Sequence, residues 1–358
     1  MDKISSKHLI FIALGLSVVS LKTYPTILIK TGRTDTWICM IIASILILFF
    51  TYYIFKICNT TNCFSITEIY YSSMGKFLGG FLIILLLITY YLTLVESSCI
   101  EASSLHTNLL FNTPTWFFVL LFTVPALYSV RKGKGALIII TLIGITLIMV
   151  AGINLAILSN RYKHYKNLFP VLVNGLSKDV ILTTLKSLGL YGFIFAAIPF
   201  AKDVDKKKNL IRDILIGMGI VIQMEIISII GTLSTFGWSR AASIAYPKLV
   251  QTQQISYWGF LESGEFFVML QVVGGWYIKY VLIFYSMLQV LKHFNKVNKY
   301  TPYIITLLVT VPSFFLSKNI FILFEALNYF SYICLANFIV IPLIVFTIYK
   351  IKTNKAQT

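Results

Sequence analysis

Long apolar segments constrain the fold of this chain more than any other feature. Runs of 18 or more apolar residues recur along its whole length, and such runs are typical of transmembrane helices. Only 12% of the residues are charged, which is about half the fraction found in soluble domains. We therefore predict an all-α polytopic membrane protein whose core lies in lipid rather than in water.

The apolar segments divide the chain into about ten transmembrane spans within one integral membrane domain, residues 1–358. The spans are expected at roughly 8–29, 36–57, 77–100, 115–130, 136–158, 185–201, 210–236, 263–291, 302–317 and 320–349. The two longest connections are 159–184 and 237–262, and both contain proline and aromatic residues. We expect them to be ordered surface segments on the outer side of the membrane.

The basic residues predict the orientation of the spans. The net charge is +17, and the charge lies mainly in the loops between spans. With the N-terminus inside, the loops on that side hold 18 of the 30 lysines and arginines, and the opposite loops hold 10. The positive-inside rule explains this distribution better than binding to nucleic acid does. We expect both termini in the cytoplasm and no nucleic-acid partner.

Two spans are interrupted at matching positions of the two halves of the chain. Span one contains "LGLSVVSLKTYP", and span six contains "SLGLYGFIFAAIP" with Gly189 and Gly192. Glycine and proline weaken a helix, and paired interruptions of this kind indicate a transporter-type binding site. We predict a five-plus-five inverted repeat, residues 8–158 and 185–349, with spans one and six broken. The alternative is that these glycines mark close contacts between membrane helices.

Enzymatic and metal-dependent chemistry has no visible support in the sequence. There is no HExxH, no GxSxG and no Walker loop, and the four histidines lie at span ends or in loops. Three of the five cysteines lie in apolar spans and two in the loop "CNTTNC", which has no histidine beside it. Free thiols are therefore favoured over a zinc site or a disulfide framework. We expect no enzyme activity, no cofactor and no metal ion.

Ionisable side chains at membrane depth are the most informative about function. They are Lys22 in span one, Glu96 in span three, Glu225 in span seven and Lys279 in span eight. Insertion scales place a charged group at mid-span about 2.5–3.5 kcal/mol uphill, so such groups usually face the bundle interior or a wet cavity. Lys279 shares a small and polar helix face with Gly275, which predicts that it points into the protein.

The alternatives differ among the other three groups. Lys22 can extend to the outer membrane surface. Glu225 fits a structural ion pair as well as a functional role. Glu96 fits the edge of a hydrated cavity and a ligand contact equally well. Tyr90 and Thr93 lie at mid-depth of span three, where packing is the more common role, although a tyrosine hydroxyl in lipid needs a partner.

Several short motifs occur in a characteristic order. "NLFPVLVNG" follows span five, "YPKLV" follows span seven, and "FLESGEFFVMLQVVGGWYIKY" opens span eight. "YP" near the end of span one precedes Trp37. In order and spacing, over the whole chain, these motifs resemble the B subunits of spore germinant receptors from endospore-forming bacteria. That family looks like a branch of the amino acid–polyamine–organocation transporters.

The resemblance implies ten spans in a five-plus-five inverted repeat, with spans one and six unwound around a small-molecule site. It also implies a multi-subunit complex in the inner spore membrane, with a larger membrane A subunit and a lipoprotein C subunit as partners. The B subunit is the one expected to bind the germinant, usually an amino acid.

We expect the ligand pocket at mid-membrane, between spans one, three, six and eight. Its residues would be Val18, Val19, Ser20, Tyr90, Thr93, Glu96, Gly189, Tyr191, Gly192, Phe193 and Lys279. The Lys279 ammonium would be a tethered cation in or beside the sodium site of the transporter fold, or the partner of a ligand carboxylate. A buried ion pair with Glu225 or Glu96 is the third possibility.

Three functions stay open for the sequence alone. The chain is a ligand-sensing receptor subunit, a free-standing amino acid permease, or a structural subunit that binds nothing. A permease needs a path for a coupling ion or proton. Neighbouring genes for an A subunit and a lipoprotein would favour the receptor, and an isolated gene would favour the permease.

Overall fold

Helices follow the apolar segments of the sequence closely. The computed structural model describes residues 5–173, 175–205, 207–255, 265–294 and 297–357, without the side chains of 18–23, 265–266 and 356–357. Within these residues no strand is present. The α-helices are α1 (His8–Thr23), α2 (Pro25–Gly32), α3 (Thr36–Thr60), α4 (Ile66–Asn108), α5 (Thr115–Arg131), α6 (Lys134–Leu158), α7 (Lys178–Tyr191), α8 (Ile198–Ala201), α9 (Leu210–Ser243), α10 (Pro247–Gln253), α11 (Glu265–Lys292), α12 (Thr301–Ser317), α13 (Ile320–Cys334) and α14 (Ile341–Gln357).

Length and composition make most of these helices candidate membrane spans. Among the described residues, seven helical segments are long and apolar enough to cross a bilayer. Three shorter apolar helices, His8–Ser17, α5 and α12, accompany them. The prediction of an all-α, multi-pass membrane protein is confirmed, since helices satisfy their own backbone hydrogen bonds in lipid. The count of ten spans and the inverted repeat stay predictions.

Two helices begin earlier than the apolar pattern predicts. α4 starts at Ile66 rather than near residue 77, because a short helix precedes Gly75, whose φ of +75° bends the chain into the long span. α7 starts at Lys178, within the connection expected over 159–184. Its first turn is capped by the Ser177 hydroxyl, which accepts a hydrogen bond from the Val180 amide at 3.4 Å.

The interruption in span one lies later than the ligand residues chosen from the sequence. α1 continues through residues 18–20 to Thr23, so unwinding at Val18–Ser20 is not observed. The break falls at Tyr24, and α2 begins at Pro25. Proline has no amide hydrogen and restricts the residue before it, which explains why the break sits there rather than at the small residues upstream.

Span six is irregular where its glycines predict it. α7 ends at Tyr191 and passes into η4, a 3-10 helix over Gly192–Ala197, followed by the short α8. The chain thus changes from an α-helix to a 3-10 helix here rather than unwinding into an extended segment. A π-helical segment, η6 (Leu335–Val340), joins α13 to α14 and packs against both α7 and η4.

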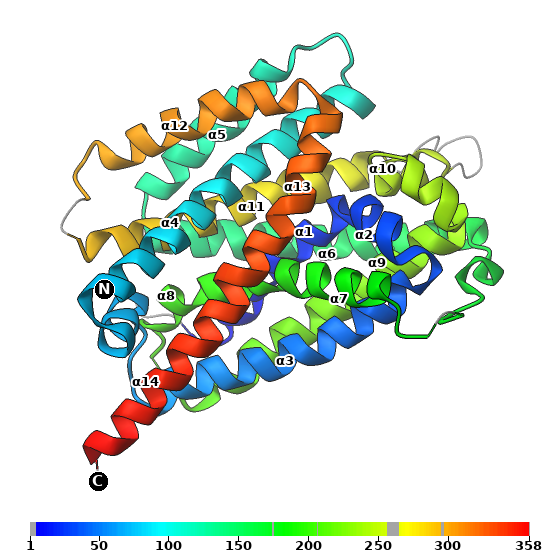
Figure 1. Cartoon of the computed structure of the whole chain (residues 1–358). Helices are drawn as coiled ribbons and strands as arrows, with labels where there is room; N and C mark the ends of the chain where they lie inside the picture. The colour runs from blue at the N-terminus through cyan, green and yellow to red at the C-terminus, as the bar shows by residue number, and fades with distance from the viewer. Residues whose placement is uncertain (1–4, 174, 206, 256–264, 295–296, 358) are drawn as a thin grey trace.

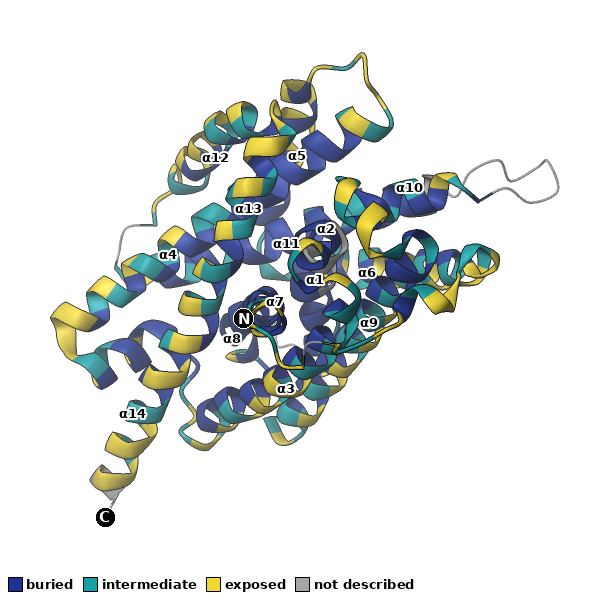
Figure 2. Cartoon of the chain, turned by 45° about the vertical axis from the view of Figure 1, so that its right-hand side comes forward, coloured by how far each residue is buried: buried dark blue, intermediate teal, exposed yellow. Residues whose placement is uncertain are grey.

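α1 occupies the middle of the helix bundle. It packs against α9, α11, α6 and η4. The helices α4, α5, α11 and α12 pack together on one side of it, and α3, α7 and α9 on the other (Figure 1). Outer faces carry large apolar side chains such as Phe49 and Phe77, which suit a lipid environment, whereas the central helices are buried (Figure 2).

The end of the bundle where α1, α6 and α9 begin is here called the N-terminal end. Polar contacts stabilise it. Lys134 at the start of α6 pairs with Asp203, which follows α8, at 2.6 Å. The Ser6 hydroxyl donates to the Asp213 carboxylate on α9, also at 2.6 Å. These contacts join the two halves of the chain at this end.

The opposite end of the bundle carries α10 and the segment with the motif "NLFPVLVNG". The Asn167 amide donates to the Ser234 carbonyl on α9 at 3.0 Å, and the Leu172 amide donates to Asp35 at 2.7 Å. This part of the connection therefore contacts α9 and the start of α3.

Candidate functional site

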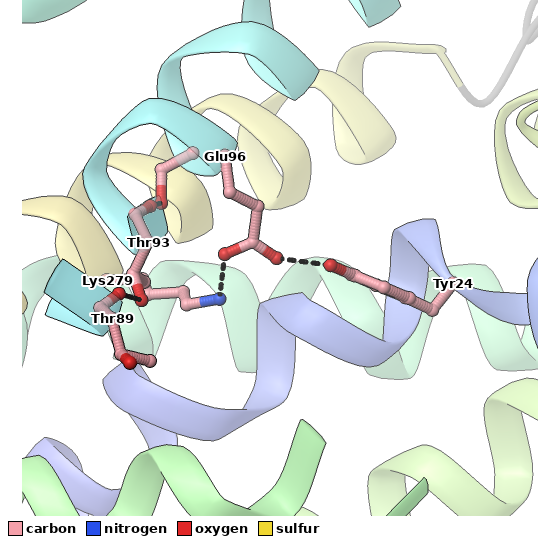
Figure 3. A network of polar contacts seen from close by, with 6 residues as sticks. Tyr24, Thr89, Thr93, Glu96 and Lys279 are labelled. Atoms are coloured by element: carbon pink, nitrogen blue, oxygen red, sulfur yellow. Dashed lines mark hydrogen bonds and ion pairs between the residues drawn. The ribbon is translucent and has the colours of Figure 1, made fainter. Parts of the chain in front are cut away.

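Lys279 lies near the middle of α11 and is fully buried. Its Nζ donates to Glu96 Oε2 on α4 at 2.9 Å. The other oxygen, Oε1, accepts a hydrogen bond from the hydroxyl of Tyr24 at 2.8 Å. Figure 3 shows the carboxylate of Glu96 held between the two. These three side chains form the Lys279–Glu96–Tyr24 network, which joins α11, α4 and the break between α1 and α2.

Electrostatics explains why Lys279 and Glu96 are paired and why the second carboxylate oxygen has its own hydrogen bond. A charge taken out of water costs several kcal/mol unless a partner of opposite sign and further hydrogen bonds compensate it. The side chains of Lys279 and Glu96 are 0% and 2% exposed. Each charge therefore depends on the other, and the Tyr24 hydroxyl satisfies the remaining carboxylate oxygen. Of the two acids considered as partners of Lys279, Glu96 is the one in contact.

Aromatic rings cover the ammonium group. Lys279 Nζ lies 3.5 Å from the centroid of the Phe193 ring in η4 and 4.8 Å from that of Trp276. Phe193 packs on Phe338 of η6 with ring centroids 5.2 Å apart, and Tyr90 also packs on Phe338, at 5.7 Å. Desolvated cation–π contacts of this kind are worth about 2 kcal/mol. The irregular segments η4 and η6 thus supply one wall of the site.

Two buried polar atoms near this wall have no hydrogen-bond partner among the described residues. The Tyr90 hydroxyl and the Trp276 indole N–H are buried, and neither makes a hydrogen bond to any of the described residues. Buried donors without a partner are uncommon and cost about 1–3 kcal/mol each.

Several residues chosen from the sequence fall together here, and others do not. Glu96, Phe193 and Lys279 are in contact, and Tyr90 joins them through Phe338. The Thr93 hydroxyl is directed to its own helix, where it donates to the Thr89 carbonyl at 2.8 Å. The side chains of Val18, Val19, Ser20 and Lys22 lie outside the described residues, as do residues 260–264 at the start of the motif that opens span eight.

The glycines of span six are packing positions. A Cβ on Gly189 would lie 2.3 Å from the carbonyl oxygen of Ser331, and one on Gly192 would lie 2.9 Å from Phe338 Cβ. Gly189 and Gly192 therefore both lie at close contacts between helices, which was the alternative considered for them from the sequence. Tyr191 points toward α3, where its hydroxyl lies 3.0 Å from that of Ser44.

Two functional candidates were missed by the sequence reasoning. Tyr24 was overlooked because span one was expected to open upstream of it. Its position directly before Pro25 was the available signal. Glu101 was overlooked because span three was expected to end at residue 100. It is 1% exposed on α4, and neither carboxylate oxygen has a hydrogen-bond partner among the described residues.

Comparison with known sequences identifies the family. Residues 3–320 match the sequence profile described as "Spore germination protein". The chain belongs to this family of spore germination proteins. It is 23% identical over 265 residues to spore germination protein YndE of Bacillus subtilis (strain 168), covering 73% of this chain and 72% of the relative. It is 22% identical over 271 residues to spore germination protein XB of Bacillus anthracis, covering 75% and 74%.

Comparison with solved structures identifies the fold. MhsT in complex with L-phenylalanine superposes with a TM-score of 0.71 at 14% identity, covering 94% of this chain and 87% of that one. A Na⁺-coupled sialic acid symporter in a substrate-bound outward-open state gives a TM-score of 0.59 at 9% identity, covering 92% and 73%. The protein is therefore a germination-related membrane protein with a transporter fold, and its family and structural neighbours are permeases and transporters rather than enzymes.

Proposed function

We propose that this chain is the membrane subunit of a spore germinant receptor that binds a small germinant, an amino acid, at mid-membrane and signals germination. The Lys279–Glu96–Tyr24 network carries the proposal. It places one cation and one anion, fully buried, between the interrupted span one and η4. Ionisable residues at membrane depth mark substrate and ion pathways in membrane proteins.

The chemistry of the network favours a zwitterionic ligand. Separating Lys279 from Glu96 would leave two buried charges unpaired, at a cost of several kcal/mol. An amino acid supplies a carboxylate for Lys279 and an ammonium for Glu96, so both charges stay compensated. The Tyr90 hydroxyl and the Trp276 N–H, which have no partner among the described residues, would contribute further hydrogen bonds. A ligand with one charge, or with none, would leave Lys279 or Glu96 buried without a counter-charge.

A cavity of about 300 Å³ lies at the N-terminal end of the bundle, beside Lys134 and Asp203. We infer access to the network through a second cavity, at the opposite end. It has a volume of about 390 Å³ and lies between α2, α7, α9 and α13. Its lining includes Lys186, Glu325 and Thr26, which lies two residues after Tyr24. The Tyr246 and Phe324 rings pack edge to face beside it, with centroids 5.4 Å apart. We infer that a germinant passes this aromatic pair to reach the network.

The family and the charge distribution support the cellular setting. We propose that the protein lies in the inner spore membrane with both termini in the cytoplasm, because the loops at the N-terminal end carry most of the lysines and arginines. As partners we propose an A-type membrane subunit and a C-type lipoprotein. The second cavity described above then opens away from the cytoplasm.

The decisive experiment compares ligands in which one charge is removed. Binding to purified protein is measured for a set of amino acids, for the amide of each carboxylate, and for the amine that lacks the carboxylate. We expect only compounds with both charges to bind. The doubly substituted variant Glu96→Gln/Lys279→Met, which leaves no buried charge, should lose binding while remaining folded. Lys318→Met, which removes an exposed lysine, is the matched control. Equal binding of acid, amide and amine would overturn the proposal.

A free-standing amino acid permease is the alternative, and the transporter fold favours it. The two functions differ in whether the bound ligand crosses the membrane. In proteoliposomes, a permease accumulates labelled amino acid when a sodium or proton gradient is imposed. The receptor subunit binds the same ligand without accumulation. Uptake that depends on a gradient would favour the permease.

A further inference from the structure

A groove on the membrane-facing surface lies apart from the site described above. It runs between α6 and α9, with α11 at its floor, and has a volume of about 210 Å³. Its walls are mostly apolar, and they include Met149, Ile153, Ile220, Met224 and Ile227. Ile153 and Ile227 are exposed, so the groove is open to the bilayer. An acyl chain is the natural occupant of such a surface in lipid.

Two lysines converge at one end of the groove, toward the opposite end of the bundle. A Cβ on Gly231 of α9 would lie 3.6 Å from Lys248 Nζ and 3.8 Å from Lys163 Cε. Lys248 donates to the Gln251 amide oxygen at 3.0 Å, and Lys163 contacts the Ala156 carbonyl at 3.4 Å. Among the described residues, no acidic side chain pairs with Lys163. Two lysine side chains therefore lie at this end of the groove, and Lys163 is the one without an acidic partner among the described residues.

A third polar group lines the same end. Ser228 is 4% exposed and lies about one helical turn before Gly231 on α9. Its hydroxyl has no hydrogen-bond partner among the described residues. Burial also lowers the pKa of Lys163, so its charged form is destabilised until an anion lies beside it. Serine, lysines and apolar walls thus share one concave surface, in which none of the described acidic side chains pairs with Lys163.

We propose that this groove binds one anionic phospholipid. The phosphate lies on Lys163 and Lys248, the Ser228 hydroxyl reaches an ester oxygen of the glycerol, and one acyl chain lies along the apolar walls of α6 and α9. Charge complementarity selects an anionic headgroup over a zwitterionic one, since a choline would bring a third positive charge to the two lysines. This site is independent of the germinant site and of the proposed function.

Lipid retention on the purified full-length protein tests the proposal. Native mass spectrometry is used to count bound lipids after incubation with dioleoyl phosphatidylglycerol, with dioleoyl phosphatidylcholine, or with inorganic phosphate. We expect preferential retention of phosphatidylglycerol. Lys163→Gln/Lys248→Gln should weaken the binding of phosphatidylglycerol roughly thirtyfold, because the variant loses two electrostatic contacts to the anionic lipid, one from each lysine. Lys166→Gln, an exposed lysine of the same connection that does not line the groove, should bind as the wild type does.

A second variant tests the apolar part of the site. Ala156→Trp keeps both lysines but fills the groove, and it should reduce binding of phosphatidylglycerol while leaving the protein folded. Equal retention of the two phospholipids by the wild type would overturn the proposal, and so would unchanged binding by both variants. Binding of inorganic phosphate as tight as that of the lipid would show a free-anion site instead, and would also overturn it.

Discussion

A buried ammonium makes strong demands on its surroundings, and Lys279 shows how they are met. It has a carboxylate at 2.9 Å and an aromatic ring at 3.5 Å. Glu96 in turn has a second donor in Tyr24. Because each group compensates another, a single substitution also leaves the partner of the changed residue buried without compensation, and this adds to the loss of stability.

Loss of one charge from the pair should be more damaging than loss of both. Lys279→Met leaves the Glu96 carboxylate buried and uncompensated, at a cost of about 3–5 kcal/mol. Glu96→Gln/Lys279→Met removes both charges and should cost clearly less. Thermal unfolding in detergent measures both. A single variant that melts at the wild-type temperature would contradict the pairing.

The Tyr24 hydroxyl should contribute measurably to the same network. Tyr24→Phe removes a hydrogen bond to a charged acceptor, for which we expect a loss of about 1.5–3 kcal/mol. Tyr91→Phe is the matched control, because its hydroxyl donates to a neutral carbonyl, that of Leu308, on an exposed surface. It should cost about 1 kcal/mol or less. Equal loss of stability in the two variants would contradict a larger contribution from the Tyr24 hydroxyl.

Only part of this site was predictable from the sequence. The depth of Glu96 and Lys279 followed from their positions in apolar segments, and the small face beside Gly275 indicated that Lys279 points inward. The choice of Glu96 over Glu225 depends on how α4, α9 and α11 pack, which hydropathy does not encode. Tyr24 became a partner because Pro25 places the break beside it.

At the scale of elements, the irregular segments decide where the site forms. Glycine and proline predicted that spans one and six are interrupted, and both interruptions adjoin the network. Their form was not predictable. η4 is a 3-10 helix rather than an open loop, and the π-helical η6 packs against it. Such local geometry depends on contacts with distant segments of the chain.

Gly189 should tolerate no side chain. A Cβ there would overlap the backbone of α13 at Ser331 and that of Leu335 in η6, at 2.3 and 2.9 Å, so Gly189→Ala forces two helices apart. We expect a destabilisation of about 1–3 kcal/mol or more. At Gly219, on the lipid-facing side of α9, a Cβ meets nothing within 4 Å. Gly219→Ala should therefore be neutral or slightly stabilising in the same melting experiment.

At the scale of the whole molecule, the two ends of the bundle differ. The N-terminal end is joined across the halves by the Lys134–Asp203 ion pair, which lines a cavity of about 300 Å³, and the opposite end carries the cavity of about 390 Å³ beside Thr26. Long apolar segments made the all-α membrane fold predictable. The shapes of the two cavities depend on side-chain contacts between segments far apart in sequence, which hydropathy does not encode.

Orientation in the membrane is open to a direct test. In a Cys63→Ser background, Asp205→Cys lies at the N-terminal end and Lys166→Cys at the opposite end. We expect an impermeant maleimide to label residue 166 in intact cells and residue 205 only after permeabilisation. The reverse pattern would refute cytoplasmic termini.

The paired charges of Lys279 and Glu96 have a further consequence for energetics. The pair is electrically neutral, and so is a zwitterion that takes its place between the two groups. Moving one net charge through the membrane field costs about 2.3 kcal/mol for each 100 mV, but a neutral exchange meets no such term. Ligand occupancy of this site should therefore be insensitive to voltage, so a cell whose membrane is not energised could still register its signal.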